Sequence, residues 1–233
     1  GAEVRRGVMV RAVAEGGGVA LADGSVLGAE RIVLATGKHD LRGAGRPRGT
    51  MLGLKMHFAK VPADLVGKIE LRLLSRGYAG LAPLENGRLN LCVALERDGF
   101  ESWPALLAAL RMEGAEPLWP RPLAVAAIPY GYRHRGEGPA YRVGDQLAVI
   151  PSFVGDGIAI ALRSARRVAE AIVAGTSPAT IHASLATELA PQFRRARMLG
   201  WVLARPRLAV AAARLLPRLL ASAASATRLR FPM

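Results

Sequence analysis

The chain has 233 residues, of which 51% are hydrophobic and 21% charged, a balance that suits a folded protein with a substantial core and excludes a disordered one. Cys92 is the only cysteine, which excludes an intrachain disulfide and a cysteine metal cluster. The formal net charge of +14 is strongly basic and raises the question of anionic partners.

The first 40 residues predict short strands. Val8–Ala14 and Val19–Leu21 are extended runs, separated by a triple-glycine turn and followed by an Asp-Gly turn. Glu30–Gly37 is an apolar strand that ends in Ala-Thr-Gly. We therefore expect a small β-meander followed by one strand.

Residues 41–135 predict an antiparallel sheet. Met51–Phe58 has the composition of a strand, and Lys68–Leu73 alternates with a period of two, as a half-buried strand does. Gly77–Leu84 and Arg88–Ala94 flank an Asn-Gly turn, which is a strong hairpin signal between two apolar runs. These strands would form one sheet.

Other features of this middle region are less regular. Trp103–Met112 predicts a short helix, and Ile128–Tyr132 predicts a strand or loop that leads out of the region. Cys92 lies in an apolar run, so we expect it in the core. Tyr78 has two interpretations, a substrate-cavity residue or a packing aromatic, because aromatic side chains serve both uses.

The segment Tyr141–Ala174 is typical of a cofactor site. The strand Tyr141–Val143 ends at a Gly-Asp pair, and a second glycine turn precedes a helix over Ile158–Ala174, with Asp156 as its expected N-cap. The N-terminus of that helix would present free N–H groups and partial positive charge, which suit an anion or an electron-rich ring edge. The alternative is an ordinary strand–loop–helix connection.

The segment resembles the second flavin-binding motif of the superfamily of FAD-dependent monooxygenases and geranylgeranyl reductases. In that motif a strand ends in Gly-Asp, and an apolar loop with a proline, a Gly-x-Gly turn and a helix follow. The resemblance implies that Asp145 contacts the ribityl or pyrophosphate region of FAD and that the backbone of Gly155–Ile158 lies beside the isoalloxazine ring. It assigns nine residues to the cofactor: Thr36, Gly37, Gly144, Asp145, Pro151, Gly155, Asp156, Gly157 and Ile158.

Two earlier stretches strengthen the resemblance. Ala35-Thr36-Gly37 resembles the end of the strand by which the family's chain returns to its FAD domain. The predicted sheet resembles the family's antiparallel wall over the flavin, and Gly77-Tyr78-Ala79-Gly80 resembles a Gly-Tyr-x-Gly turn near the active site. The resemblance thus implies that Tyr78 and Gly80 face the substrate.

The chain also departs from the family. No strand-Gly-x-Gly-x-x-Gly-helix unit is present in the sequence, and a dinucleotide fold needs that turn to hold the pyrophosphate. Gly43-Ala44-Gly45 has neither the strand nor the helix, and Pro47 stands where the helix should begin. We therefore expect the C-terminal part of a longer protein, which alone holds FAD weakly or not at all.

The sequence as a whole predicts an α/β fold. An α+β substrate sheet (residues 41–135) would be inserted in an incomplete FAD-binding Rossmann-like domain (residues 1–40 and 136–175), and a C-terminal helical region (residues 176–233) would follow.

The C-terminal region is rich in Ala, Leu and Arg, and it predicts two or three short helices broken near Pro206 and Pro217. Met198–Ala204 is too short an apolar run to span a bilayer. Three interpretations of the basic charge follow, in order: a solvated surface, peripheral contact with an anionic membrane, and nucleic-acid binding, for which no motif is found. We expect a cytoplasmic protein, with contact at the inner membrane face under the second interpretation.

The predicted function is that of an FAD-dependent oxidoreductase that transfers hydride to a hydrophobic or lipid-like substrate. A flavin monooxygenase is the first alternative, and a non-catalytic remnant or binding module is the second. No catalytic side chain is identified. Ser152 lacks a hydrolase frame, and no metal site is expected because four histidines lack ligand spacing: His39, His57, His134 and His182.

Overall fold

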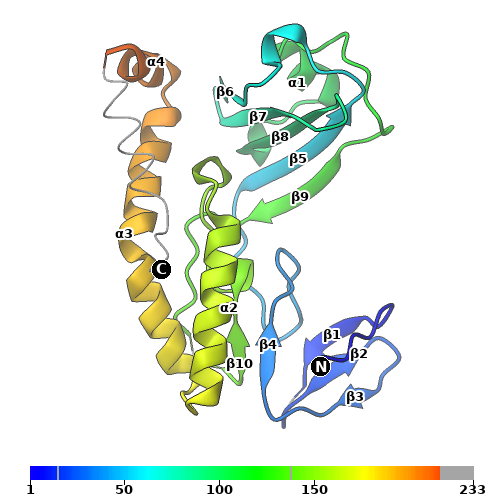
Figure 1. The fold of residues 1–233 in the computed structure, drawn as a ribbon, viewed down its shortest axis with the longest axis vertical. Helices are drawn as coiled ribbons and strands as arrows, with labels where there is room; N and C mark the ends of the chain where they lie inside the picture. Colours follow the sequence, from blue (N-terminus) through cyan, green and yellow to red (C-terminus); the bar gives the residue numbers. More distant parts are fainter. Residues whose placement is uncertain (15, 137, 216–233) are drawn as a thin grey trace.

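The computed structural model describes residues 1–14, 16–136 and 138–215 (Figure 1). It begins with a three-stranded antiparallel sheet of β1 (Val10–Val13), β2 (Val19–Leu21) and β3 (Val26–Leu27), in that order. Glycine turns join these strands, and Gly18 has a φ of 107° and lies against the carbonyl oxygen of Leu27. The predicted meander is confirmed, with β3 as a short strand that the sequence pattern did not indicate.

A short parallel pair forms the centre of the molecule. β4 (Ile32–Leu34) pairs with β10 (Ala140–Arg142), so that Leu34 stands opposite Arg142. Parallel strands need a crossover connection, and here the connection is the whole middle region of the chain. Because the strands run the same way, the Thr36-Gly37 turn after β4 and the Gly144-Asp145 turn after β10 leave the pair at one edge.

The middle region is a five-stranded antiparallel sheet. Its strands are β5 (Met51–Phe58), β6 (Glu70–Leu74), β7 (Gly77–Pro83), β8 (Leu89–Glu96) and β9 (Leu123–Ile128), in the order β6-β7-β8-β5-β9. Two short 3-10 turns, η1 (Ala63–Leu65) and η2 (Arg97–Gly99), and the helix α1 (Trp103–Ala109) connect them.

The predicted strands of this sheet are confirmed apart from β9. β9 is an edge strand of small, mostly exposed residues, and Ala127 has a positive φ of 58° next to an irregularity in the pairing with β5. An irregular alanine-rich edge strand carries little periodic signal. The predicted helix ends earlier than expected, because Arg111 adopts a φ of 51° just beyond α1.

One face of the sheet is buried against α1. Leu54, Phe58, Leu81 and Leu91 point to this face and pack with Leu106 of α1. The alternation of strand residues sends Cys92 to the opposite face, where it is exposed. The expectation that Cys92 lies in the core is therefore wrong, because the buried positions of β8 are those on either side of it.

Two helices pack against the parallel pair. After the 3-10 turns η3 (Gly144–Gln146) and η4 (Ser152–Val154), α2 (Gly157–Val173) and α3 (Pro178–Leu203) pack on β10 (Figure 1). Their shared core includes Tyr141, Ile160, Leu185 and Leu189. The combination of antiparallel sheets, a parallel pair and helices confirms the mixed α and β class.

The C-terminal region differs from the expected short helices. α3 has 26 residues and continues through Pro191, and α4 (Pro206–Leu215) follows after a break at the predicted place. Buried residues on both sides of Pro191, Leu189 and Phe193, hold the helix against α2 and β10. Packing therefore outweighs the proline's local cost. The break expected at Pro217 lies outside the described residues.

None of the helices in the described ranges is long and apolar enough to cross a membrane.

Adjacent residues of β8 should respond differently to truncation. Leu91→Ala removes a side chain that is 0% exposed, and we expect the free energy of unfolding to fall by about 2 to 5 kcal/mol. Cys92→Ala changes an exposed side chain and should alter it by less than about 0.5 kcal/mol. Urea titration followed by circular dichroism measures both, and equal losses would contradict the assigned faces.

Candidate functional site

A pocket of about 490 Å³ lies where the ends of β4 and β10 meet the start of α2. Six of the nine predicted cofactor residues line it: Gly37, Gly144, Asp145, Gly155, Gly157 and Ile158. The other three, Thr36, Pro151 and Asp156, are next to these in sequence but outside the lining. The structure thus brings together two turns that are more than a hundred residues apart in the sequence.

Glycines shape the walls of this pocket. Gly144 has a φ of 56°, and a Cβ atom there would lie 3.3 Å from the Cβ of Ala161, so the turn after β10 packs closely on α2. Gly155 has a φ of 80°, which L side chains rarely adopt. At Gly157 a Cβ would meet no atom within 4 Å, because the position borders open pocket space. A side chain at Gly157 would therefore occupy the space that a bound group needs.

The N-terminus of α2 faces the same pocket through Gly157 and Ile158, whose side chain is 77% exposed. The first turn of a helix has N–H groups without helical partners and carries partial positive charge. Asp156 holds the expected N-cap position, but no side-chain hydrogen bond caps the helix. Its buried carboxylate instead accepts a hydrogen bond of 2.5 Å from Gln192 Nε2 of α3, so the predicted capping role is wrong.

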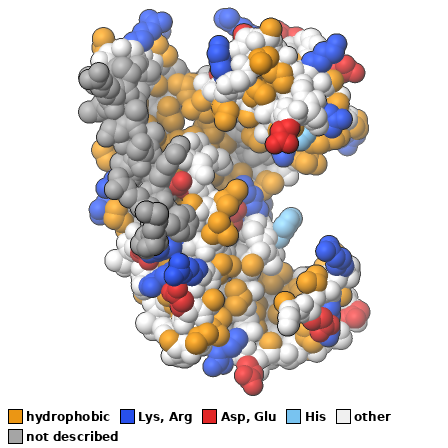
Figure 2. Space-filling model, viewed as in Figure 1, with side chains coloured by type: hydrophobic (Ala, Val, Ile, Leu, Met, Phe, Trp, Pro, Cys, Tyr) orange, Lys and Arg blue, Asp and Glu red, His pale blue; other side chains and the backbone are white. Residues whose placement is uncertain are grey.

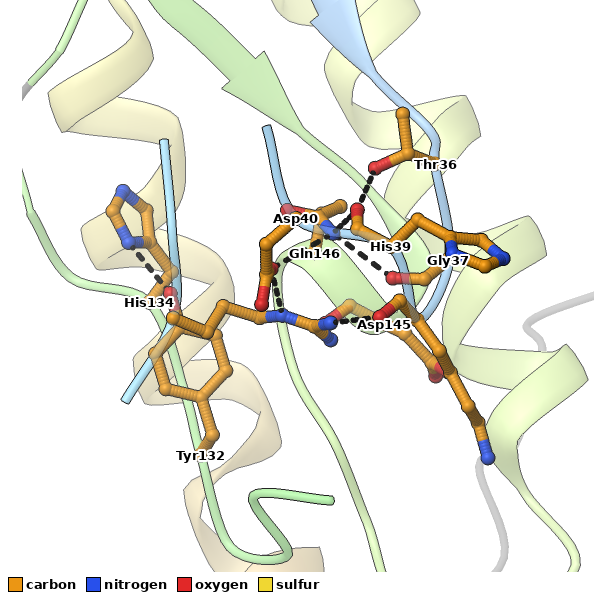
Figure 3. Close-up of polar contacts among 10 residues, drawn as sticks. Thr36, Gly37, His39, Asp40, Tyr132, His134, Asp145 and Gln146 are labelled. Atoms are coloured by element: carbon orange, nitrogen blue, oxygen red, sulfur yellow. Dashed lines mark hydrogen bonds and ion pairs between the residues drawn. The ribbon is translucent and has the colours of Figure 1, made fainter. Parts of the chain in front are cut away.

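A hydrogen-bond network joins the turn after β4 to the turn after β10 (Figure 3). The guanidinium of Arg46 donates to Asp40 Oδ1 at 2.7 Å, to the carbonyl of Asp145 at 2.8 Å and to that of Lys38 at 2.9 Å. Only 3% of the Arg46 side chain is exposed. The amide of Gln146 donates to the carbonyls of Gly37 and His39, each at 2.9 Å.

No local sequence pattern predicts this network. Arg46 lies in the loop after Gly43-Ala44-Gly45, which has neither the strand nor the helix of a dinucleotide turn, and Gln146 directly follows the Gly-Asp pair. Thr36 donates its hydroxyl to the carbonyl of His39 at 2.6 Å and shapes the turn, and its predicted contact with the cofactor stays a prediction. The nearest sequence signal was the polar amide at position 146, directly before the apolar run that begins at Leu147.

Hydroxyl groups form the wall of the pocket nearest the five-stranded sheet. Tyr130 and Ser152 both line the pocket, and their oxygens are 2.6 Å apart. The hydroxyl of Tyr78 accepts a hydrogen bond of 3.1 Å from the backbone N–H of Phe153, and the two rings meet edge to face at 5.5 Å. Burial raises the pKa of Tyr78, and the nearby Tyr130 raises it further, so Tyr78 stays protonated.

The face of the sheet opposite α1 continues from this wall. Strand pairing aligns two rows across it, one of Leu71, Gly80, Cys92, Lys55 and Leu123, the other of Leu73, Tyr78, Ala94, Gly53 and Val125. Tyr78 and Gly80 therefore share one face. Neither lines the pocket itself, and Tyr78 reaches its edge through Phe153. Figure 2 shows the molecule hollowed between the lobes of the five-stranded and N-terminal sheets.

Within the described ranges, no group of three or more His, Cys, Asp or Glu side chains could hold a metal ion.

The sequence matches no protein-family model and no curated protein. Solved structures, in contrast, match it over most of its length. A flavin-dependent halogenase from Xanthomonas campestris superposes with a TM-score of 0.64 at 15% identity, over 83% of this chain and 41% of its own. A probable FAD-dependent monooxygenase from Pseudomonas aeruginosa gives 0.52 at 19% identity, over 84% of this chain and 63% of its own.

This chain has the fold of part of these FAD-dependent enzymes. A flavin-dependent halogenase from Brevundimonas agrees, with a TM-score of 0.61 at 16% identity and 84% of this chain covered. At these identities the likeness is one of fold. The chain spans about two fifths of the length of both halogenases.

Two histidines lie near the contact between β10 and α3. His182 Nε2 accepts a hydrogen bond of 2.9 Å from the backbone N–H of Arg142, and the rings of His182 and His134 are 4.8 Å apart. His134 Nδ1 lies 3.0 Å from the hydroxyl of Tyr132 (Figure 3). Burial, followed by the charge of Arg142, lowers the pKa of His134 to about 4, and burial also lowers the pKa of His182.

The Arg46 network predicts a local loss of stability on truncation. Arg46→Ala removes the donor to the carbonyls of Asp145 and Lys38 and the ion pair with Asp40, and we expect it to lower the free energy of unfolding by about 1 to 3 kcal/mol. Amide hydrogen exchange should rise in residues 37–40 and 144–146. Arg48→Ala, at an exposed arginine two residues away, is the matched control and should change stability by less than about 0.5 kcal/mol.

The lowered pKa of His134 should make the folded protein less stable at acidic pH. The unfolded chain protonates His134 near the ordinary pKa of 6.5, whereas the folded chain does so only near 4. Between these values the unfolded state binds more protons, so the free energy of unfolding falls as pH drops from about 6.5 to about 4. Urea titrations across this range measure the slope. His134→Gln should reduce it, and an unchanged slope would contradict the assignment.

Proposed function

We propose that this chain forms the flavin end of the site in an FAD-dependent oxidoreductase. The observation that carries the proposal is the convergence of Gly37, Asp145 and the start of α2 on one pocket. These are the residues of a motif that resembles flavin-binding sequences, in a fold shared with FAD-dependent enzymes. The parallel pair β4 and β10 would then belong to a Rossmann-like FAD domain, into which the five-stranded sheet is inserted.

The residues present fit a flavin. The open space beside Gly157 admits a flat ring against the backbone, and the positive end of α2 suits the electron-rich edge of that ring. The carboxylate of Asp145 is a hydrogen-bond acceptor for ribityl hydroxyls. When bound, FAD would supply two-electron chemistry, either hydride donation or activation of dioxygen. The protein's part is to orient the ring and exclude water.

We place the substrate on the far side of the Tyr78–Phe153 contact, on the sheet face opposite α1. Small residues occupy its centre, Gly80, Cys92 and Gly53, beside the single charged side chain of Lys55, and leucines stand at its edges. Such a face suits a hydrophobic organic molecule. Tyr130 and Ser152 offer hydroxyl groups between this face and the pocket.

Two reactions are candidates for the site. Oxygen-dependent modification of an organic substrate is favoured because similar structures include a monooxygenase and halogenases. Hydride transfer to a lipid-like acceptor is the second candidate, and the Gly77-Tyr78-Ala79-Gly80 segment of β7, on the proposed substrate face, supports it. Oxygen uptake stimulated by substrate would select the first, and anaerobic reduction of an alkene by the reduced protein would select the second.

Flavin content tests the proposal directly. The product of the complete gene should purify with flavin absorbance, and Gly157→Val should lower its affinity for FAD at least about tenfold by filling the pocket. Gly114→Val is the matched control, because Gly114 is exposed and borders open space away from the pocket. Fluorescence titration with FAD measures both.

A complete product that neither carries flavin nor binds added FAD would leave a non-catalytic binding module as the better explanation. An equal loss of affinity in both glycine variants would contradict the position of the ring.

A further inference from the structure

A surface at the C-terminal end of the described chain mixes arginines with exposed apolar side chains. It consists of the C-terminal part of α3 together with the whole of α4, residues 194–215, and we call it the α3–α4 surface. Its arginines are Arg194, Arg195, Arg197, Arg205, Arg207 and Arg214. Its exposed large apolar residues are Met198, Trp201, Leu208, Val210 and Leu215.

The charge on this surface has one sign. No Asp or Glu follows Glu188 in the sequence, whereas the first part of α3 and its neighbour α2 pair their charges. The carboxylate of Glu188 forms an ion pair with Arg163 Nε at 2.7 Å, and Glu170 forms one with Arg166 Nε at 2.9 Å. Beyond Glu188 the sequence supplies arginines but no acidic residues, which gives this surface a net positive charge that attracts anions.

Helical spacing arranges both residue types in common stripes. Arg194, Met198 and Trp201 follow one another at intervals of four and three residues, which places them on one side of α3, and Arg205 follows just beyond the end of that helix. The guanidinium of Arg205 lies 3.8 Å from the centre of the Trp201 ring and donates to the Trp201 carbonyl.

A similar stripe follows α4. Arg207, Val210, Ala211 and Arg214 line one shallow hollow together with Leu215, which is 78% exposed. Figure 2 shows blue and orange side chains side by side at the upper left, where Figure 1 places α4.

We propose that the α3–α4 surface binds the surface of an anionic phospholipid bilayer. Guanidinium groups bind phosphate with paired hydrogen bonds, and tryptophan is favoured at the boundary between headgroups and acyl chains. Exposed Met198, Leu208 and Leu215 add apolar area that can enter the headgroup region. Nucleic acid would use the arginines but leave this apolar area in water.

The surface is the outer side of a helix whose inner side reaches the pocket wall. Gly200 of α3 lies against Phe153, where a Cβ atom would be 3.5 Å from Phe153 Cζ. Phe153 in turn packs on Tyr78. A protein bound through Trp201 would therefore hold the sheet face close to the bilayer, where hydrophobic molecules concentrate. This last step rests on the proposed function, whereas lipid binding does not.

Vesicle binding tests the proposal. The purified protein should float with vesicles of phosphatidylcholine and phosphatidylglycerol but not with phosphatidylcholine alone, and added salt should weaken binding. Replacing Arg197, Arg207 and Arg214 by Gln should weaken it about a hundredfold, at about fivefold per arginine. Replacing the exposed Arg6, Arg11 and Arg31 by Gln removes the same charge elsewhere and should retain most of the binding.

A second measurement tests whether the apolar side chains enter the bilayer. Brominated phosphatidylcholine in the anionic vesicles should quench tryptophan fluorescence, and Trp201→Phe should abolish that quenching, because Trp103 and Trp119 pack against the core of the five-stranded sheet. Three outcomes overturn the proposal: no binding to anionic vesicles, an equal loss in both arginine triples, or binding to RNA that needs these arginines while vesicle binding does not. None of these outcomes changes the flavin content, so the lipid-binding proposal and the flavin proposal can be rejected independently of each other.

Discussion

The pairing of β4 with β10 is the constraint on which the rest of the structure depends. Each strand has only three residues, yet their parallel alignment brings the turns after them to one edge. A parallel pair this short provides few backbone hydrogen bonds, and the buried guanidinium of Arg46 and amide of Gln146 add side-chain bonds between the same two turns. The buried charge of Arg46 is tolerated because each of its three guanidinium nitrogens donates to an oxygen atom.

The pocket beside this pair is built mainly from backbone. Gly144 allows the turn to approach α2, and Gly155 adopts a left-handed conformation before the helix begins. The carboxylate of Asp156 turns to Gln192 of α3, so the pocket side of the first turn of α2 is not covered by a side-chain cap. Backbone N–H groups and a helix terminus are fixed dipoles that need no reorganisation when a ligand binds. This arrangement suits the orientation of a flat, electron-rich group.

The two faces of the five-stranded sheet differ in their packing. One face packs on α1 and forms the core of the lobe, and the other carries mostly smaller residues, among them the exposed Cys92. Tyr78 joins that exposed face to the pocket wall, and Phe153 joins the same wall to α3 at Gly200. The contacts of Phe153 with Tyr78 and with Gly200 thus connect the sheet face, the pocket wall and the helix that carries Trp201.

The sequence by itself determined the elements and the motif. The period-two runs of the sheet, the Asn-Gly turn and the glycine-flanked helix α2 are local signals, and local propensity and hydrophobic alternation are enough to predict them. Local signals failed where tertiary packing decides, as at Pro191 inside α3 and at the irregular edge strand β9.

Only the tertiary structure decided which residues meet. The contacts of Arg46 with Asp145, of Gln146 with Gly37 and of Tyr78 with Phe153 join positions far apart in the chain, which no periodicity can align. The side-chain role of Asp156 also depended on a distant partner, Gln192. A motif read along the chain predicts which backbone forms a pocket, whereas the side chains that hold that pocket in place come from elements brought together by folding.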